Sequence, residues 1–83
     1  MLEKTLIDLA HRHFEIMWRY EAMTNSIIVH MEKRYKQQWH KQNYRVTFRE
    51  IGCSGGFEVL MTMLLKHLAD ETDRTIKVNC NSD

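Results

Sequence analysis

The sequence predicts a small α+β domain whose elements follow in the order helix, helix, strand, helix, strand. Apolar residues recur at helical spacing over residues 2–42 and 56–70, they alternate along 44–51 and 74–80, and all three glycines lie together at 52–56. The 83 residues suffice for a single domain, 1–83, with a small core. We therefore expect a homodimer that completes or covers the short sheet.

The first helix is predicted over residues 2–22. One apolar stripe recurs at alternating steps of four and three, and a second stripe lies beside it. A face this broad exceeds what one short partner helix can cover, so we expect a second copy to cover part of it. The dimer interface is then expected to comprise Leu6, Leu9, His13, Ile16 and Tyr20, with Val59 and Met63 from the later helix.

A second helix is predicted over 26–42, after a break at the cap-forming residues 24–26. Ile27, Met31, Tyr35 and Trp39 recur at steps of four and would form its buried side. Two alternatives stay open. A single bent helix could run from 2 to 42, and the β-branched residues of 26–30 could form a short strand.

The second half of the chain predicts a strand, a helix and a strand. Residues 44–51 alternate between apolar and polar, the glycine cluster follows, and 56–70 is strongly amphipathic. The acids at 70–73 disfavour a longer helix because they would lie at its negative end. Residues 74–80 alternate again, so the two strands are expected to lie parallel, joined by a right-handed crossover.

The charges are strongly segregated along the chain. Residues 33–49 contain six basic residues and no acid, which leaves −5 for the rest of a chain whose net charge is +1. This pattern favours a basic surface that binds nucleic acid or a nucleoprotein through its phosphates. The alternative is an inhibitor or regulatory module that docks on an acidic protein surface. The binding residues are expected to be Lys33, Arg34, Lys36, Lys41, Arg45, Arg49 and Lys77.

Aromatic residues are interleaved with these cations, as on surfaces that stack bases. On the predicted second helix, however, Tyr35 and Trp39 fall on the apolar side. We interpret them as core or dimer contacts. The cations would then touch phosphates without reading sequence, and the pattern does not distinguish DNA from RNA.

The glycine-rich loop is the remaining candidate site. Gly52, Ser54, Gly55 and Gly56 stand at a strand-to-helix turn, where backbone amides can bind an anion. The loop lacks the lysine and spacing of a P-loop, and we favour a tight turn around a small, buried Cys53. One thiol without a positioned base is a weak nucleophile signal.

No catalytic, metal or cofactor site is predicted. The histidines and cysteines lack metal-ligand spacing, and the carboxylates are scattered, so we expect a binding protein and not an enzyme. No apolar stretch approaches the roughly 18–20 residues of a membrane span, and the N-terminus carries acids where a signal peptide is apolar. The two cysteines then favour free thiols in the cytoplasm.

Overall fold

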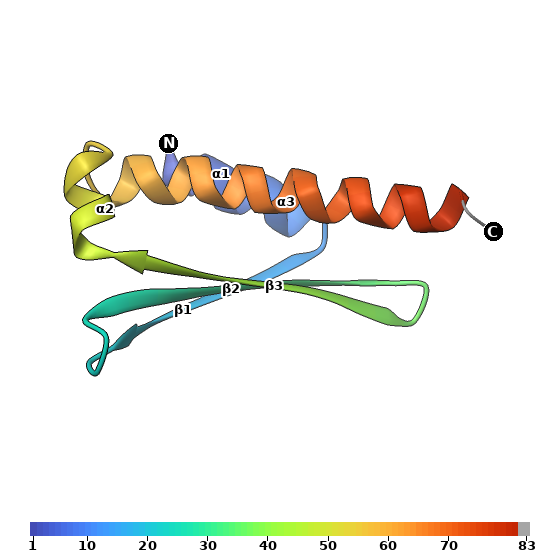
Figure 1. Ribbon diagram of the computed structural model, residues 1–83. Coiled ribbons are helices and arrows are strands. Elements are labelled where there is room, and N and C mark those ends of the chain that lie inside the picture. The colour runs from blue at the N-terminus through green and yellow to red at the C-terminus, as the bar shows by residue number, and fades with distance from the viewer. Residues whose placement is uncertain (82–83) are drawn as a thin grey trace.

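The computed structural model describes residues 1–81, and the side chains of residues 1–78. Within this range the chain forms helices and one antiparallel sheet, which confirms the α+β class (Figure 1). The elements are α1 (Leu2–His11), β1 (Phe14–Glu21), β2 (Ser26–Tyr35), β3 (Gln38–Thr47), α2 (Phe48–Cys53) and α3 (Phe57–Asn81).

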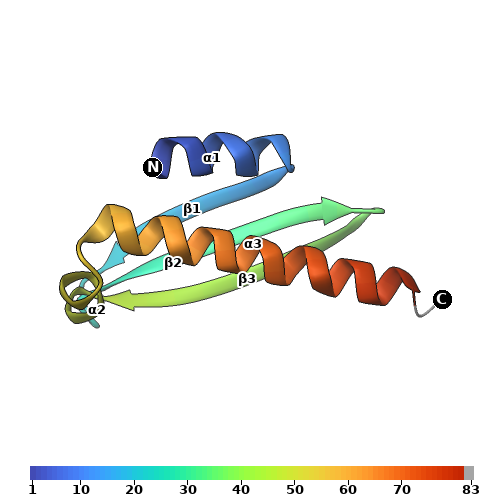
Figure 2. The ribbon, with the colours of Figure 1, turned by 90° about the horizontal axis from the view of Figure 1, so that it is seen from above.

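The molecule has two layers, with helices on one face of the sheet only (Figure 1). The strands are arranged in the order β1-β2-β3. Seen from the helix side, α3 crosses over β2 and β3, while α1 lies beside β1 (Figure 2). Within residues 1–81, no element covers the opposite face of the sheet. We call that surface the open face.

The core lies between the sheet and the helices. Buried side chains come from all three strands and both long helices, among them Leu9, Phe14, Val29, Val46 and Leu65. Because side chains alternate along a strand, every second residue of each strand faces this core. The residues between them face the open side, so the alternation determines which charged side chains lie on the open face.

The first predicted helix is correct only up to His11. His13 takes a left-handed conformation with φ of 68°, and residues 14–21 leave the helix as β1. A step of four residues returns to the same face in a helix and also in a strand. Ile16 and Tyr20 therefore satisfied the helical pattern while they alternate as strand residues do.

The predicted second helix is wrong, and so is the single bent helix from 2 to 42. Residues 26–47 form the antiparallel β2–β3 hairpin, joined by Lys36 and Gln37, both with positive φ (49° and 67°). Two central residues with positive φ match the twist of a hairpin, although neither is Gly or Asn here. The alternative of a strand at 26–30 correctly indicated the start of β2.

Of the three elements predicted over residues 44–80, the helix is confirmed, the first strand is correct only over 44–47, and the second strand is wrong. The expected strand ends at Thr47, which begins α2 through a capping box with Glu50. The helix expected over 56–70 is present as the first part of α3. The strand predicted over 74–80 is wrong, because α3 continues through these residues and buries Ile76. The parallel crossover is therefore absent, since the strands pair antiparallel.

The acidic residues at 70–73 do not end this helix, because at least one of them, Asp73, is bound by two cations. Asp73 accepts hydrogen bonds from Arg12 Nη2 at 2.7 Å and from Lys33 Nζ at 2.8 Å. These two contacts join α3 to the end of α1 and to β2. The cations compensate the carboxylate, so the helix continues past it.

Candidate nucleic-acid interface

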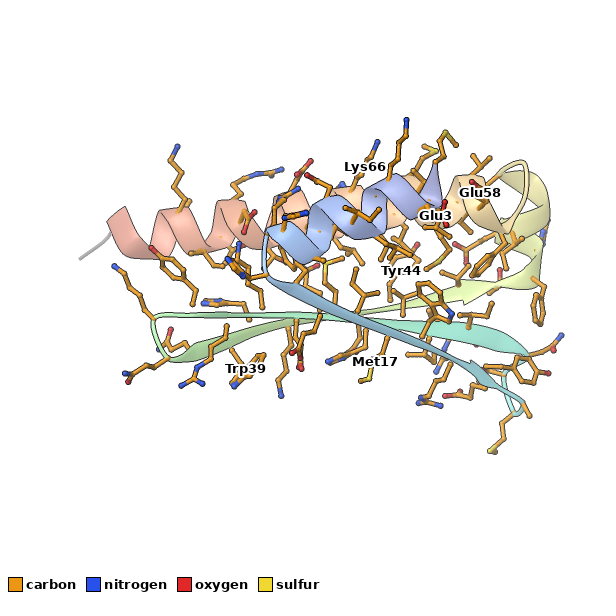
Figure 3. The ribbon with its side chains drawn as sticks, turned by 180° about the vertical axis from the view of Figure 1, so that it is seen from behind. Glu3, Met17, Trp39, Tyr44, Glu58 and Lys66 are labelled. Atoms are coloured by element: carbon orange, nitrogen blue, oxygen red, sulfur yellow. The ribbon has the colours of Figure 1, made fainter. Side chains whose placement is uncertain are left out.

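The open face is built from rows of side chains that lie opposite one another across the strands. Arg19, Ile28 and Arg45 form one row. The next rows are Met17–His30–Asn43, Glu15–Glu32–Lys41 and Arg34–Trp39. Figure 3 shows Met17 and Trp39 pointing away from the helices, whereas Tyr44 points toward them.

Three of the predicted binding cations lie together on this face: Arg34, Lys41 and Arg45. Lys41 and Arg45 are exposed on β3, and Arg34 is exposed on β2, in the open-face row next to that of Lys41. Among the described residues, no carboxylate lies within 4.0 Å of the charged groups of Arg34 or Lys41, whereas Arg45 Nη2 lies 3.3 Å from Glu21.

The other predicted cations lie elsewhere. Lys33 faces the helices, where it bonds Asp73 and its side chain is only 15% exposed. Lys36 is at the hairpin tip, with its ammonium 5.5 Å from the centre of the Tyr35 ring. Arg49 is on α2, and Lys77 is on α3 in the helical layer. The basic segment is therefore divided between the two sides of the sheet.

Arg19 is a cation of the open face that the sequence analysis missed. It lies on β1 in the same row as Arg45, and its Nη2 is 3.5 Å from Glu21. Because residues 2–22 were expected to be helical, Arg19 was not placed next to the basic segment. Alternation over 14–21 is the signal that would have found it.

Trp39 was expected in the core or in a dimer contact, but it is 49% exposed on the open face. Odd-numbered residues point toward the core on β2 but toward the open face on β3, because a two-residue turn joins the strands. Trp39 and Met31 therefore lie on opposite faces of the sheet. Its direct neighbour across the strands is Arg34. An exposed indole beside a guanidinium and near Lys41 offers both a stacking surface and positive charge.

An open hollow of about 400 Å³ lies beside these cations, lined by Met17, Trp18, Arg19, Ile28, His30 and Asn43. His30 Nδ1 lies 2.5 Å from Asn43 Oδ1, and its Nε2 lies 3.1 Å from Glu32 Oε2. These two hydrogen bonds, first that to Asn43 and then that to Glu32, raise the pKa of His30 above its ordinary value. The imidazole is thus fixed at both nitrogens.

The glycine loop lies at the other end of the fold from the hairpin tip. Gly52 belongs to α2, Ser54 follows its last turn, and Gly55 and Gly56 have positive φ (92° and 116°). Anion binding by this loop remains a prediction. Cys53 was expected to be buried, but its thiol is free and exposed.

The predicted dimer residues do not form one surface. Leu9 is fully buried by its own chain, and Leu6 and Ile16 pack against the same core. Val59 is half-buried, whereas His13, Tyr20 and Met63 are exposed. Tyr20 packs against Phe48, with ring centres 5.9 Å apart.

Comparison with known proteins gives no family: no family model matches the chain, and no curated protein or solved structure is significantly similar to it. Among the described side chains, no three of His, Cys, Asp or Glu converge as a metal site. No helix within residues 1–81 has the length and apolar character needed to cross a membrane.

Proposed function

We propose that this protein binds single-stranded nucleic acid on the open face of its sheet. The observation that carries the proposal is the combination of Arg34, Trp39, Lys41 and Arg45 on one uncovered surface. Cations neutralise phosphates, and an exposed indole stacks on a base of any sequence. A duplex keeps its bases stacked inside, so an exposed aromatic residue favours a single strand.

The spacing of the cations supports the same function. Lys41 and Arg45 stand at alternate open-face positions of β3, separated by Asn43. Neighbouring open-face positions of a strand are about 6.6–6.8 Å apart. An extended nucleic-acid strand along β3 would therefore meet a polar or charged side chain at each step, with Arg34 and Trp39 at the end nearest the hairpin turn.

The acidic residues of the open face restrict where a nucleic-acid strand would lie, because they repel its phosphates. Glu15 and Glu21 are on β1, and Glu21 pairs with both Arg19 and Arg45. Glu32 is on β2, directly across from Lys41. The phosphates are consequently expected along β3, and the bases are expected to point across the sheet toward β2. The alternative of an acidic protein partner uses the same cations, and an exposed tryptophan is also common in protein interfaces, so the binding experiment below separates the two.

The test is fluorescence anisotropy with labelled single-stranded and duplex oligonucleotides between about 50 and 200 mM salt. We expect single strands to bind more tightly, with affinity that falls log-linearly with salt. The double variant Arg34→Glu/Lys41→Glu should lose most of the affinity and show a shallower salt slope. Its matched control is Lys66→Glu/Lys77→Glu, which changes the same charge on exposed positions of α3.

Two results would contradict the proposal. One is equal loss of binding in the two double variants, which would indicate an effect of net charge alone. The other is absence of binding by the native protein even at low salt. That second result would favour the acidic protein partner, which a pull-down with the same pair of variants would then test.

We propose in addition that the protein is a cytoplasmic homodimer. The free thiol of Cys53 is typical of a reducing compartment. Met63, 64% exposed on α3, and Ile7 on α1 leave apolar surface uncovered on the helical layer. Light scattering at high micromolar concentration tests the dimer, which a mass of one 10.0 kDa chain would contradict.

A further inference from the structure

The hollow of the open face has an apolar floor and a polar margin. Met17 and Ile28 supply apolar surface, while Arg19, His30 and Asn43 contribute polar atoms. Pockets that hold small planar ligands usually combine apolar walls with a few placed polar groups. The hollow adjoins β3, along which the phosphates are expected. A base of a nucleic-acid strand bound along β3 could therefore enter the hollow while its phosphates stay on β3.

The hydrogen bonds of His30 determine which atom Asn43 presents. Glu32 accepts from His30 Nε2, because a carboxylate has no hydrogen to donate. The amide oxygen Oδ1 of Asn43 faces His30 Nδ1, which donates to it when the imidazole carries both protons. The NH₂ group of Asn43 is then the free end of the amide.

On balance, the charged groups around His30 favour the imidazole that carries both protons. Glu32 on its own strand and Glu15 on β1 are acids of the adjoining row, whereas Lys41 on β3 opposes the positive charge. Arg19 also lines the hollow; its guanidinium, which lies 3.5 Å from Glu21, carries only hydrogen-bond donors and no acceptor atom. Both ring nitrogens of His30 are already engaged, so the polar groups that the hollow offers to a ligand are Arg19 and the Asn43 NH₂, and both donate.

We infer that the hollow binds a nucleobase with exocyclic carbonyl oxygens, such as uracil, in preference to a base that has an amino group there. The inference rests on the proposed function and names the substrate class of the same surface. Uracil and cytosine are the sharpest pair for comparison. They share the carbonyl at position 2 and differ at position 4, where uracil has a carbonyl acceptor and cytosine an amino donor, and at ring nitrogen 3, which donates in uracil and accepts in cytosine.

The experiment compares oligouridine and oligocytidine of equal length by fluorescence anisotropy at one salt concentration and pH 6. We expect the native protein to bind oligouridine several-fold more tightly. The variant Asn43→Asp keeps an acceptor for His30 but replaces the donating NH₂ by a carboxylate oxygen. It should reduce the ratio of the two affinities to about one or invert it, since each well-placed base contact contributes on the order of a tenfold discrimination.

The matched control is Asn25→Asp in the β1–β2 turn. It makes the same change of charge and keeps the acceptor that Asn25 Oδ1 provides for the Tyr20 hydroxyl. The control should keep the native ratio. Circular dichroism must show that Asn43→Asp is folded; if it is not, Asn43→Ser, which is smaller and uncharged, replaces it and should also lower the ratio.

The outcomes separate this inference from the proposed function. Equal binding of the two oligonucleotides by the native protein, with a steep salt dependence, overturns the inference and leaves the proposed function standing. A native preference that Asn43→Asp does not change also overturns it. Absence of binding to either oligonucleotide contradicts both.

Discussion

Replacing Asp73 by Asn should destabilise the fold by roughly 1–2 kcal/mol. The carboxylate accepts hydrogen bonds from Arg12 at 2.7 Å and Lys33 at 2.8 Å, and Asp73 is 35% exposed. Hydrogen bonds to charged groups contribute about 1.5–3 kcal/mol each when buried, whereas exposed ion pairs contribute about 0.2–1 kcal/mol. Solvent screening at this intermediate exposure reduces each contact to about 1 kcal/mol or less.

Urea unfolding followed by circular dichroism measures this change, and Asp70→Asn is the matched control. Asp70 is on the same helix, 3.3 Å from the same guanidinium, but it is 66% exposed and has no contact with Lys33. The control should unfold close to the native midpoint. In a domain of this size the loss in Asp73→Asn corresponds to a melting temperature lower by about 4–8 °C per kcal/mol.

The pH dependence gives a second measurement. Burial raises the pKa of Asp73, but hydrogen bonds from Lys33 and Arg12 outweigh it and place the pKa below its ordinary value. A carboxyl with a depressed folded pKa stabilises the fold above its unfolded pKa of about 3.9. That stabilisation is lost as the pH falls through the folded pKa. The free energies of unfolding of the native protein and of Asp73→Asn should therefore differ most near neutral pH and become equal in acid. Equal stability of Asp73→Asn and Asp70→Asn at pH 7 would refute the reasoning.

Three further predictions concern single positions. Thr47→Ala removes the hydroxyl that accepts from the Glu50 backbone N–H, while the backbone N–H of residue 47 can still donate to the Glu50 carboxylate; the loss should cost about 1 kcal/mol in thermal unfolding. Gln37→Gly relieves a positive φ of 67° and should raise the melting temperature, whereas Gln38→Gly inside β3 should lower it. His30 should titrate above its ordinary pKa of about 6.5 by NMR, and Asn43→Ala should lower that pKa. Because the folded pKa is raised, the stabilisation by His30 is present below about pH 6.5 and lost as pH rises through the folded pKa.

The sequence predicted the α+β class, the first part of α3 and the second half of β3. It failed over residues 14–42 because steps of four residues are common to helices and strands. Ile27, Met31 and Tyr35 fulfil both patterns, and the turn at Lys36 and Gln37 has no glycine to mark it. The β-branched residues at 27–29 were the available signal for the strand.

The candidate site was predicted in part for the same reason. The run of basic residues is visible in the sequence. Its division between the two faces of the sheet depends on which residues of each strand point inward and which point outward, and this depends on the hairpin. Lys33 and Arg34 are adjacent, so they point to opposite sides of β2, and only Arg34 reaches the open face. Arg19 joins that face through β1, 15 positions before Arg34 in the sequence, which local charge counting could not detect.

The same parity explains why one segment serves both the fold and the proposed binding surface. Inward positions of β2 and β3 supply Val29, Met31 and Val46 to the core and Lys33 to the ion pair with Asp73. Outward positions are free of packing demands, so Arg34 and Lys41 can be replaced without opening the core. Substitutions of Arg34 or Lys41 should therefore change nucleic-acid binding and leave stability nearly unaltered, while substitution of Lys33 should do the reverse. A variant of Lys33 that lost binding at full stability would contradict this division of roles.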